Sequence, residues 1–265
     1  MGMFDVIYFD KSVNCNVCGR PIDHTQTKMF DCSMMDYEIC DYVNTTVAGY
    51  IERSFIFDEI LFCKNYSTDE RHKHSEQLVY FVLFKNIIAF MSEEEDKADD
   101  IYDELLKLSA AQIDYMKSCA ITATNYKRNY SRIENSIKHL TNFLSEGKEF
   151  VTRFILNPNS ISPFNKITYV DFIKGLDIWF KELIQSLVVS KSSFFYPNCP
   201  NLTKCSKEIK NIFSKMEMRY ITYKNLFESY LKLLNEIHEI YNKNGLTYML
   251  NHIHELKLEF INENN

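Results

Sequence analysis

A run of apolar residues between Thr203 and Asn244 constrains the fold of this chain more than any other feature. Its members follow one another at alternating steps of four and three residues: Ile209, Phe213, Met216, Tyr220, Tyr223, Phe227, Tyr230, Leu234, Ile237 and Tyr241. Such a heptad seam predicts one helix with an apolar stripe along its whole length. At about 1.5 Å of rise per residue, a helix of roughly 40 residues is about 60 Å long and needs an equally long partner.

A second seam supplies that partner. Ser92 and Glu95 form a predicted capping box, after which no Pro occurs until Pro158. The apolar residues that follow are Ile101, Leu105 and Leu108, then Cys119, Ala123, Tyr126, Tyr130, Ile133, Ile137, Leu140 and Leu144. Residues 93–156 are therefore predicted to form one very long helix or two nearly collinear ones, with the small polar patch Ser118–Asn125 as the expected break. We expect the two seams to pack antiparallel within one chain, or to swap between two chains of a homodimer.

Four further predictions concern the rest of the C-terminal half. Asn157 to Pro163 is a loop rich in helix breakers, and Thr168 begins a helix that extends to Ser190. Asn244-Gly245 ends the heptad helix, and a last helix covers residues 246–261.

The N-terminal part predicts short strands. Alternating or continuous apolar runs cover residues 3–10, 25–30, 37–43, 55–62, 78–83 and 87–91, and the last two are joined as a hairpin by Phe84-Lys85-Asn86. The predicted fold class is α+β: a small β-rich head at residues 1–92, followed by a long antiparallel, coiled-coil-like helical body at residues 93–265.

A Cys-x-x-Cys-Gly turn at Cys15–Gly19 is the clearest chemical motif. Its two thiolates can point at one metal ion, because Gly19 lets the backbone fold back, although a plain turn with two free thiols has the same sequence. Cys63 ends a predicted strand where a second such turn would sit, but Tyr66 occupies the position of its partner. The predicted zinc ligands are therefore Cys15, Cys18, Cys63 and His72, with His74 as the other choice for the fourth. A site that has lost its metal, and a second pair at Cys32 and Cys40, are the alternatives.

The same stretch carries a resemblance. A first strand, the turn at Cys15–Gly19, Gln26-Thr27-Lys28, Cys32, Met34, Tyr37-Glu38-Ile39, Cys63 and the hairpin strand Tyr80–Leu83 follow in this order. This order over about residues 1–95 resembles small zinc-ribbon-like proteins of phages and prophages, most of which have no assigned activity. The chain departs from their pattern at Tyr66, where a Cys is expected, and at Cys40, where a Gly would follow Tyr-x-Ile. The resemblance implies a zinc ribbon and an origin in a mobile genetic element.

Charge is unevenly distributed along the chain. Residues 1–96 hold 8 Lys and Arg against 17 Asp and Glu, whereas the remaining residues hold 22 against 19. An acidic head matches a basic protein surface better than nucleic-acid phosphates. We expect Glu52, Asp58, Glu59 and Asp69 to contact such a partner. Tyr- and Lys-rich stretches at residues 126–132 and 215–224 suit single-stranded nucleic acid, but their tyrosines fall on the seams.

Catalytic motifs are missing from the sequence. There is no H-E-x-x-H, and six glycines leave little from which to build a phosphate-binding loop. The acidic residues from Asp96 to Glu104 are interpreted as capping and solvation of a helix rather than as an ion site. We therefore expect no enzymatic activity.

Met1–Asp10 lacks a basic region before an apolar one, so no signal peptide is expected. No apolar run reaches 18 residues, so no membrane span is expected.

These observations lead to a functional hypothesis. The chain is predicted to be a non-enzymatic phage or prophage protein in the cytoplasm of a bacterial host. It would bind a host protein complex and block or remodel it sterically, for example as an inhibitor of a defence system. The alternative is a nucleic-acid-binding zinc-ribbon regulator.

Overall fold

The computed structural model describes residues 4–30, 34–43, 52–63, 77–156, 178, 181–185, 187, 198 and 200–263, with the backbone alone at 139–156, 241 and 244–263. The chain is mixed α+β, as predicted. It divides into two compact units, one of residues 1–124 and 195–221 and the other of residues 125–194 and 222–265. The first unit extends past residue 92, and the boundary between head and body at that residue stays a prediction.

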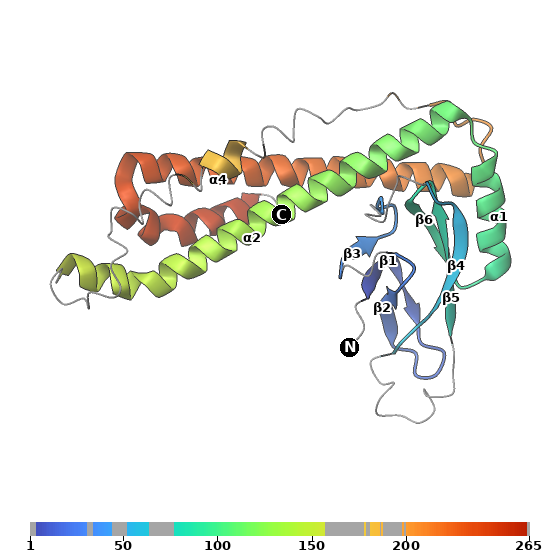
Figure 1. Ribbon diagram of the computed structural model, residues 1–265, viewed down its shortest axis with the longest axis horizontal. Helices are drawn as coiled ribbons and strands as arrows, with labels where there is room; N and C mark the ends of the chain where they lie inside the picture. The colour runs from blue at the N-terminus through green and yellow to red at the C-terminus, as the bar shows by residue number, and fades with distance from the viewer. Residues whose placement is uncertain are drawn as a thin grey trace. The chain divides into compact units, whose positions relative to one another are not determined.

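Two three-stranded sheets lie in the first unit (Figure 1). In the first sheet, β1 (Asp5–Asn14) pairs antiparallel with β2 (Pro21–Thr27) and parallel with β3 (Asp36–Glu38). In the second, β4 (Phe55–Ile60), β5 (Leu78–Phe84) and β6 (Ile87–Ser92) form an antiparallel meander. The predicted strands are therefore present, although β2 begins four residues earlier and β3 is much shorter than the run at 37–43.

Aromatic rings join the two sheets. Phe9 lies 6.1 Å from Phe81, and Phe30 lies 5.8 Å from Phe57, measured between ring centroids. The chain after β3 also links them, because the Cys40 amide donates to the Ile88 carbonyl at 2.8 Å. Helix α1 (Glu95–Leu106) covers the second sheet with Ala98, Ile101 and Leu105 (Figure 1). The layers of the first unit thus share one hydrophobic core.

The start of α1 corrects the predicted capping box. Ser92 is the last residue of β6, and its hydroxyl accepts from the Glu94 amide at 3.0 Å, while Glu94 occupies the N-cap position of α1.

The break in the long helix also differs from the expected one. It falls between Leu106 and Ala110, where α2 (Ala110–Leu156) begins, and the helix continues through the patch Ser118–Asn125.

Ser109 explains the position of that break. Its hydroxyl accepts from the Gln112 amide at 3.4 Å, and its own amide donates to the Gln112 side chain at 2.9 Å. This reciprocal pair is a capping box, so it starts a new helix at this point.

Helix α4 (Lys207–Glu263) contains the first seam and continues beyond its predicted end. The backbone is helical through Asn244-Gly245, although the ribbon changes direction in its red C-terminal part (Figure 1). A helical Gly weakens a helix by about 1 kcal/mol relative to Ala without having to end it. Of the helix predicted at residues 168–190, residues 178, 181–185 and 187 are helical, and the rest, like the loop at 157–163, lies outside the described residues.

Most seam residues whose side chains the structure describes are buried, as predicted, while Leu108, Tyr130, Tyr223 and Tyr230 are half-buried. On α2, Cys119, Ala123, Tyr126, Ile133 and Ile137 are at most 3% exposed. On α4 the seam residues below 10% exposure are Ile209, Phe213, Met216, Tyr220, Phe227, Leu234 and Ile237.

The direction of packing was predicted wrongly. In the first unit, Gln112 donates to the Cys205 sulfur and Tyr115 stacks on Phe213. In the second unit, Tyr126 lies against Phe227, and Glu134 accepts from the Tyr230 hydroxyl. Positions on the two helices increase together in each unit, so α2 and α4 run parallel rather than antiparallel. A heptad seam fixes which face of a helix is apolar but not its direction, and residues 157–206 are enough chain to return to the starting end.

Candidate metal centre

The turn between β1 and β2 presents the first two thiols. Gly19 adopts φ +70°, a left-handed conformation that Gly reaches without steric cost. The Gly19 amide donates to the Cys15 carbonyl, and the Cys15 amide donates to the Arg20 carbonyl, each at 2.8 Å. These two bonds close the turn and bring the thiols of Cys15 and Cys18 to the same place, as the Cys-x-x-Cys-Gly motif predicts.

Cys63 joins them from the end of β4. The Thr25 hydroxyl donates to the Ile60 carbonyl at 3.1 Å, which aligns the end of β4 with β2. The Sγ atoms of Cys18 and Cys63 are then 3.6 Å apart, and the Sγ atoms of all three cysteines lie within 4.8 Å of one another. This thiol cluster (Cys15, Cys18 and Cys63) confirms that the three predicted cysteines come together.

Gln77 forms hydrogen bonds with the backbone of the turn that carries Cys15 and Cys18. Its Oε1 accepts from the Asn16 amide, and its Nε2 donates to the Asn14 carbonyl, both at 3.0 Å. Cys63 and Gln77, the described residues on either side of 64–76, therefore both lie at the thiol cluster. His72 and His74 belong to this segment and lie outside the described residues. The sequence did not indicate a role for Gln77, because a glutamine before a strand belongs to no recognisable motif.

The environment of Cys15 favours a thiolate. Burial acts to raise its pKa, but the backbone amides of Cys18 and Val17 and the neighbouring thiols outweigh it, so the pKa falls to about 7. Amide donors stabilise the charged form of a thiol. Cys15 and Cys63 are buried, while Cys18 is half-buried.

Three sulfur donors at these distances can hold a metal ion. A tetrahedral ion with metal–sulfur bonds of about 2.3 Å separates its sulfurs by about 3.8 Å, close to the Cys18–Cys63 distance. Within the part of the chain that the structure describes, the group consists of these three residues, which leaves one tetrahedral position for a further ligand. Cys40 is not part of the group: it is buried in the core, where burial raises its pKa to about 12. Cys32 lies outside the described residues.

The acidic residues expected to bind a partner have different surroundings. Glu52 forms ion pairs with Lys85 and Lys117, which keep its pKa below the usual value. Asp58 is exposed on β4. Glu59 is half-buried, and this burial raises its pKa. Asp69 lies outside the described residues. Of the four, Asp58 is therefore the described carboxylate that is most accessible to another molecule.

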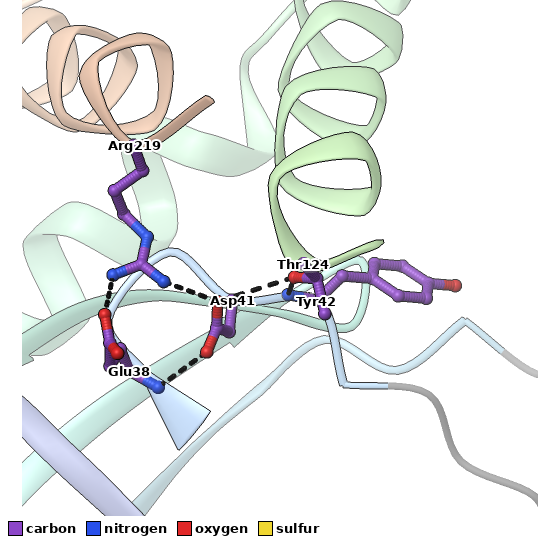
Figure 2. Close-up of polar contacts among 5 residues, drawn as sticks. All are labelled: Glu38, Asp41, Tyr42, Thr124 and Arg219. Atoms are coloured by element: carbon purple, nitrogen blue, oxygen red, sulfur yellow. Dashed lines mark hydrogen bonds and ion pairs between the residues drawn. The ribbon is translucent and has the colours of Figure 1, made fainter. Parts of the chain in front are cut away.

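A polar network that the sequence did not predict surrounds Asp41 (Figure 2). Its carboxylate is paired with Arg219 of α4 at 2.5 Å and accepts from the Glu38 amide at 2.8 Å and, more weakly, from the Thr124 hydroxyl at 3.4 Å. Arg219 also pairs with the Glu38 side chain. Because Arg219 and Asp41 are separated by 178 positions, no local pattern could have indicated the pair. The network connects the end of β3 to α2 and α4.

No protein-family model matches the chain, and no match was found among curated proteins or solved structures. Among the helices of the described residues, none has an apolar stretch of the length that a membrane crossing requires.

Proposed function

We propose that this protein is a non-enzymatic binding protein whose N-terminal unit is stabilised by one zinc ion. Cys15, Cys18 and Cys63 would hold the ion, with His72 or His74 as the fourth ligand. The observation that carries the proposal is the convergence of three thiols from two separate segments. A bound zinc would supply folding free energy and no reaction, since a centre with four protein ligands has no open position for a substrate.

Metal analysis tests the site directly. The full chain, purified without chelator, should contain one zinc per molecule by elemental analysis, and Cys18→Ser or Cys63→Ser should lower the content several-fold. Cys205→Ser is the matched control, because Cys205 is a half-buried thiol outside the cluster. His72→Asn and His74→Asn, measured separately, identify the fourth ligand. Well under one zinc per wild-type chain would reject the metal site.

The binding surface we propose lies on α1 and β4. Glu95, Asp96, Asp99 and Asp103 are exposed on α1, and Asp58 is exposed on β4. Asp58 is paired with Tyr80 across β4 and β5, and burial together with the charges of Glu95 and Asp58 raises the pKa of Tyr80. These five residues therefore form one acidic face, and a basic protein surface is the partner that complements it.

The wider biological role stays a proposal from the sequence resemblance. The protein would come from a phage or prophage and act in the host cytoplasm by occupying a host protein complex, for example one that serves in defence. Packing of the seam tyrosines supports a protein partner over nucleic acid. Tyr130 stacks on Tyr223 at 5.9 Å and Tyr126 is buried against Phe227, so these rings face one another rather than bases.

A capture experiment with charge variants tests the partner class. Wild-type protein is used to retain a partner from host lysate, and the association rate with that purified partner is measured at two salt concentrations. Asp58→Lys with Asp99→Lys should slow association at least tenfold at low salt, whereas the control Glu236→Lys with Glu239→Lys, on exposed positions of α4, should change it little. Unchanged binding by the first variant would exclude the acidic face. Salt-sensitive binding to DNA with no retained protein would favour the regulator instead.

A further inference from the structure

Two sulfurs of the thiol cluster are close enough to react with each other. The Sγ atoms of Cys18 and Cys63 are 3.6 Å apart, and a disulfide joins sulfurs at about 2.05 Å. A movement of about 1.5 Å would therefore bond them, which is within the range that side-chain rotation provides. The two residues lie 45 positions apart, on the β1–β2 turn and at the end of β4.

Access from solvent differs within the cluster. Cys18 is half-buried, whereas Cys15 is 5% exposed and Cys63 is 7% exposed. An oxidant must first reach the sulfur, and the half-buried Cys18 is more accessible than Cys15, whose environment favours the thiolate but which is buried. A small oxidant therefore meets Cys18 first. The buried Cys63 sulfur then lies beside the oxidised atom as a resolving thiol.

We propose that Cys18 and Cys63 are a peroxide-sensitive pair that forms a reversible disulfide. Hydrogen peroxide transfers one oxygen to the Cys18 sulfur, which gives a sulfenic acid and releases one water. The Cys63 sulfur attacks that sulfur, the S–O bond breaks, the S–S bond forms, and the hydroxyl leaves as a second water with the Cys63 proton. The two sulfurs together lose two electrons, and the peroxide gains them.

The consequence rests on the zinc site proposed above. A disulfide removes two of the three described sulfur donors, so oxidation and metal binding exclude each other at this site. The disulfide would connect the same two segments that the ion connects, and the first unit would keep a cross-link in either state. Peroxide would thus exchange a metal cross-link for a covalent one.

Peptide mapping of the metal-free full chain tests the pair. After treatment with hydrogen peroxide, free thiols are alkylated and the protein is digested and analysed by mass spectrometry. We expect a Cys18–Cys63 cross-linked peptide, which dithiothreitol reverses, with Cys15 and Cys205 still alkylated. A Cys15–Cys18 cross-link, irreversible oxidation of Cys18 without a cross-link, or no reaction would each overturn the proposal.

Serine variants separate the roles of the thiols. Cys63→Ser should leave Cys18 as a sulfenic acid that dimedone labels, and Cys15→Ser should keep the cross-link. Loss of the cross-link in Cys15→Ser, with the circular dichroism spectrum unchanged, would contradict the assignment. If Cys63→Ser fails to fold, the map of the wild-type chain still decides.

Zinc added before peroxide distinguishes this proposal from the metal site. Protection of Cys18 by one equivalent of zinc supports both. A cross-link that forms equally fast with and without zinc rejects the metal site and leaves the thiol pair standing. One zinc per chain with no cross-link in the metal-free protein rejects the thiol pair alone.

Discussion

Asp41 is a carboxylate with 1% of its surface exposed, and its charge is balanced inside the protein. Removing a charge from water costs several kcal/mol unless a partner and hydrogen bonds replace the lost solvation. Arg219 provides the opposite charge, and the Glu38 amide provides a hydrogen bond (Figure 2). Asp41 therefore depends on a residue of α4 for its stability in the core.

Arg219→Met should lower the free energy of unfolding by about 3–5 kcal/mol, because it leaves Asp41 buried without its counter-ion. Adding Asp41→Asn to that variant should recover part of the loss, since no buried charge remains. Urea unfolding measures both. Lys232→Met is the control: Lys232 forms an exposed pair with Glu236, and such pairs contribute at most about 1 kcal/mol. A loss below 1 kcal/mol for Arg219→Met would show that the buried pair does not form in solution.

Asn86 combines an unusual backbone with three hydrogen bonds. Lys85 and Asn86 have φ of 52° and 62°, as the two central residues of a type I′ hairpin turn require. The Asn86 side chain accepts from the Arg53 amide at 2.8 Å, its amide donates to the Arg53 carbonyl, and its carbonyl accepts from Val43. The turn thus holds the segments on both sides of residues 44–51.

Asn86→Ala should destabilise the protein more than Asn86→Gly does. Both variants remove the bond to the Arg53 amide, at a cost of about 1–3 kcal/mol. Only Ala adds the left-handed strain of about 1–2 kcal/mol. Thermal melts should rank wild type above Gly and Gly above Ala. Equal melting temperatures for the two variants would mean that the backbone conformation contributes nothing here.

Among the larger elements, α2 and α4 show what a pattern of residues predicts and what it leaves open. The alternating strands, the Cys15–Gly19 turn with Cys63 and the two buried seams followed from local spacing, because side-chain period and turn chemistry are local properties. Ser92 and Ser109 both precede a Glu or Gln by three residues, yet only Ser109 caps a helix through that residue. Ser92 is held in β6 by strand pairing with Tyr80, a tertiary contact that local sequence does not specify.

Contacts between residues far apart in the sequence could not be predicted either, because local spacing does not specify tertiary contacts. The parallel direction of α2 and α4 depends on how residues 157–206 return, and the pairing of Arg219 with Asp41 depends on that direction. At the thiol cluster, the spacing predicted the three cysteines. The role of Gln77 could not be predicted, because its contact with Asn16 depends on how β5 lies beside the β1–β2 turn.

Phe227→Ala should cost about 3–5 kcal/mol, because Phe227 is fully buried against Tyr126 in the second unit. Tyr130→Ala should cost less, about 1–2 kcal/mol, since Tyr130 is half-buried and loses less contact area. Asn225→Ala, at an exposed position of α4, serves as the control. Chemical denaturation gives the three values. If Phe227→Ala and Asn225→Ala unfold at the same denaturant concentration, the seam is not a core.

For the molecule as a whole, the first unit is assembled from distant parts of the chain. Its hydrophobic core contains residues of both sheets and of α1, and also four residues of α4: Ile209, Ile212, Phe213 and Met216. Without α4, the apolar surfaces that these four side chains cover would face water. If residues 1–92 folded alone, their core would lack the contacts with α4 and also those with α1.

Fragment complementation checks this dependence. Residues 1–92, supplied with zinc, should show no cooperative thermal transition. Residues 1–124 should gain one when a peptide of residues 200–221 is added, and the peptide with Phe213→Ala should be much less effective because it lacks the ring that stacks on Tyr115. A cooperative transition for residues 1–92 alone would instead support an independent domain that ends at residue 92.

Because the first unit consists of two separate stretches of the chain, it cannot finish folding until the second stretch has been synthesised. A ribosome that has completed residue 124 must add nearly a hundred further residues before residue 221 is made. At about 5–20 residues per second, that interval lasts roughly 5–20 seconds. During this time, the surfaces that α4 later covers, including the Tyr115 ring, have no partner from α4. A nascent chain of this protein is therefore expected to be a substrate for ribosome-associated chaperones until the last part of the unit emerges.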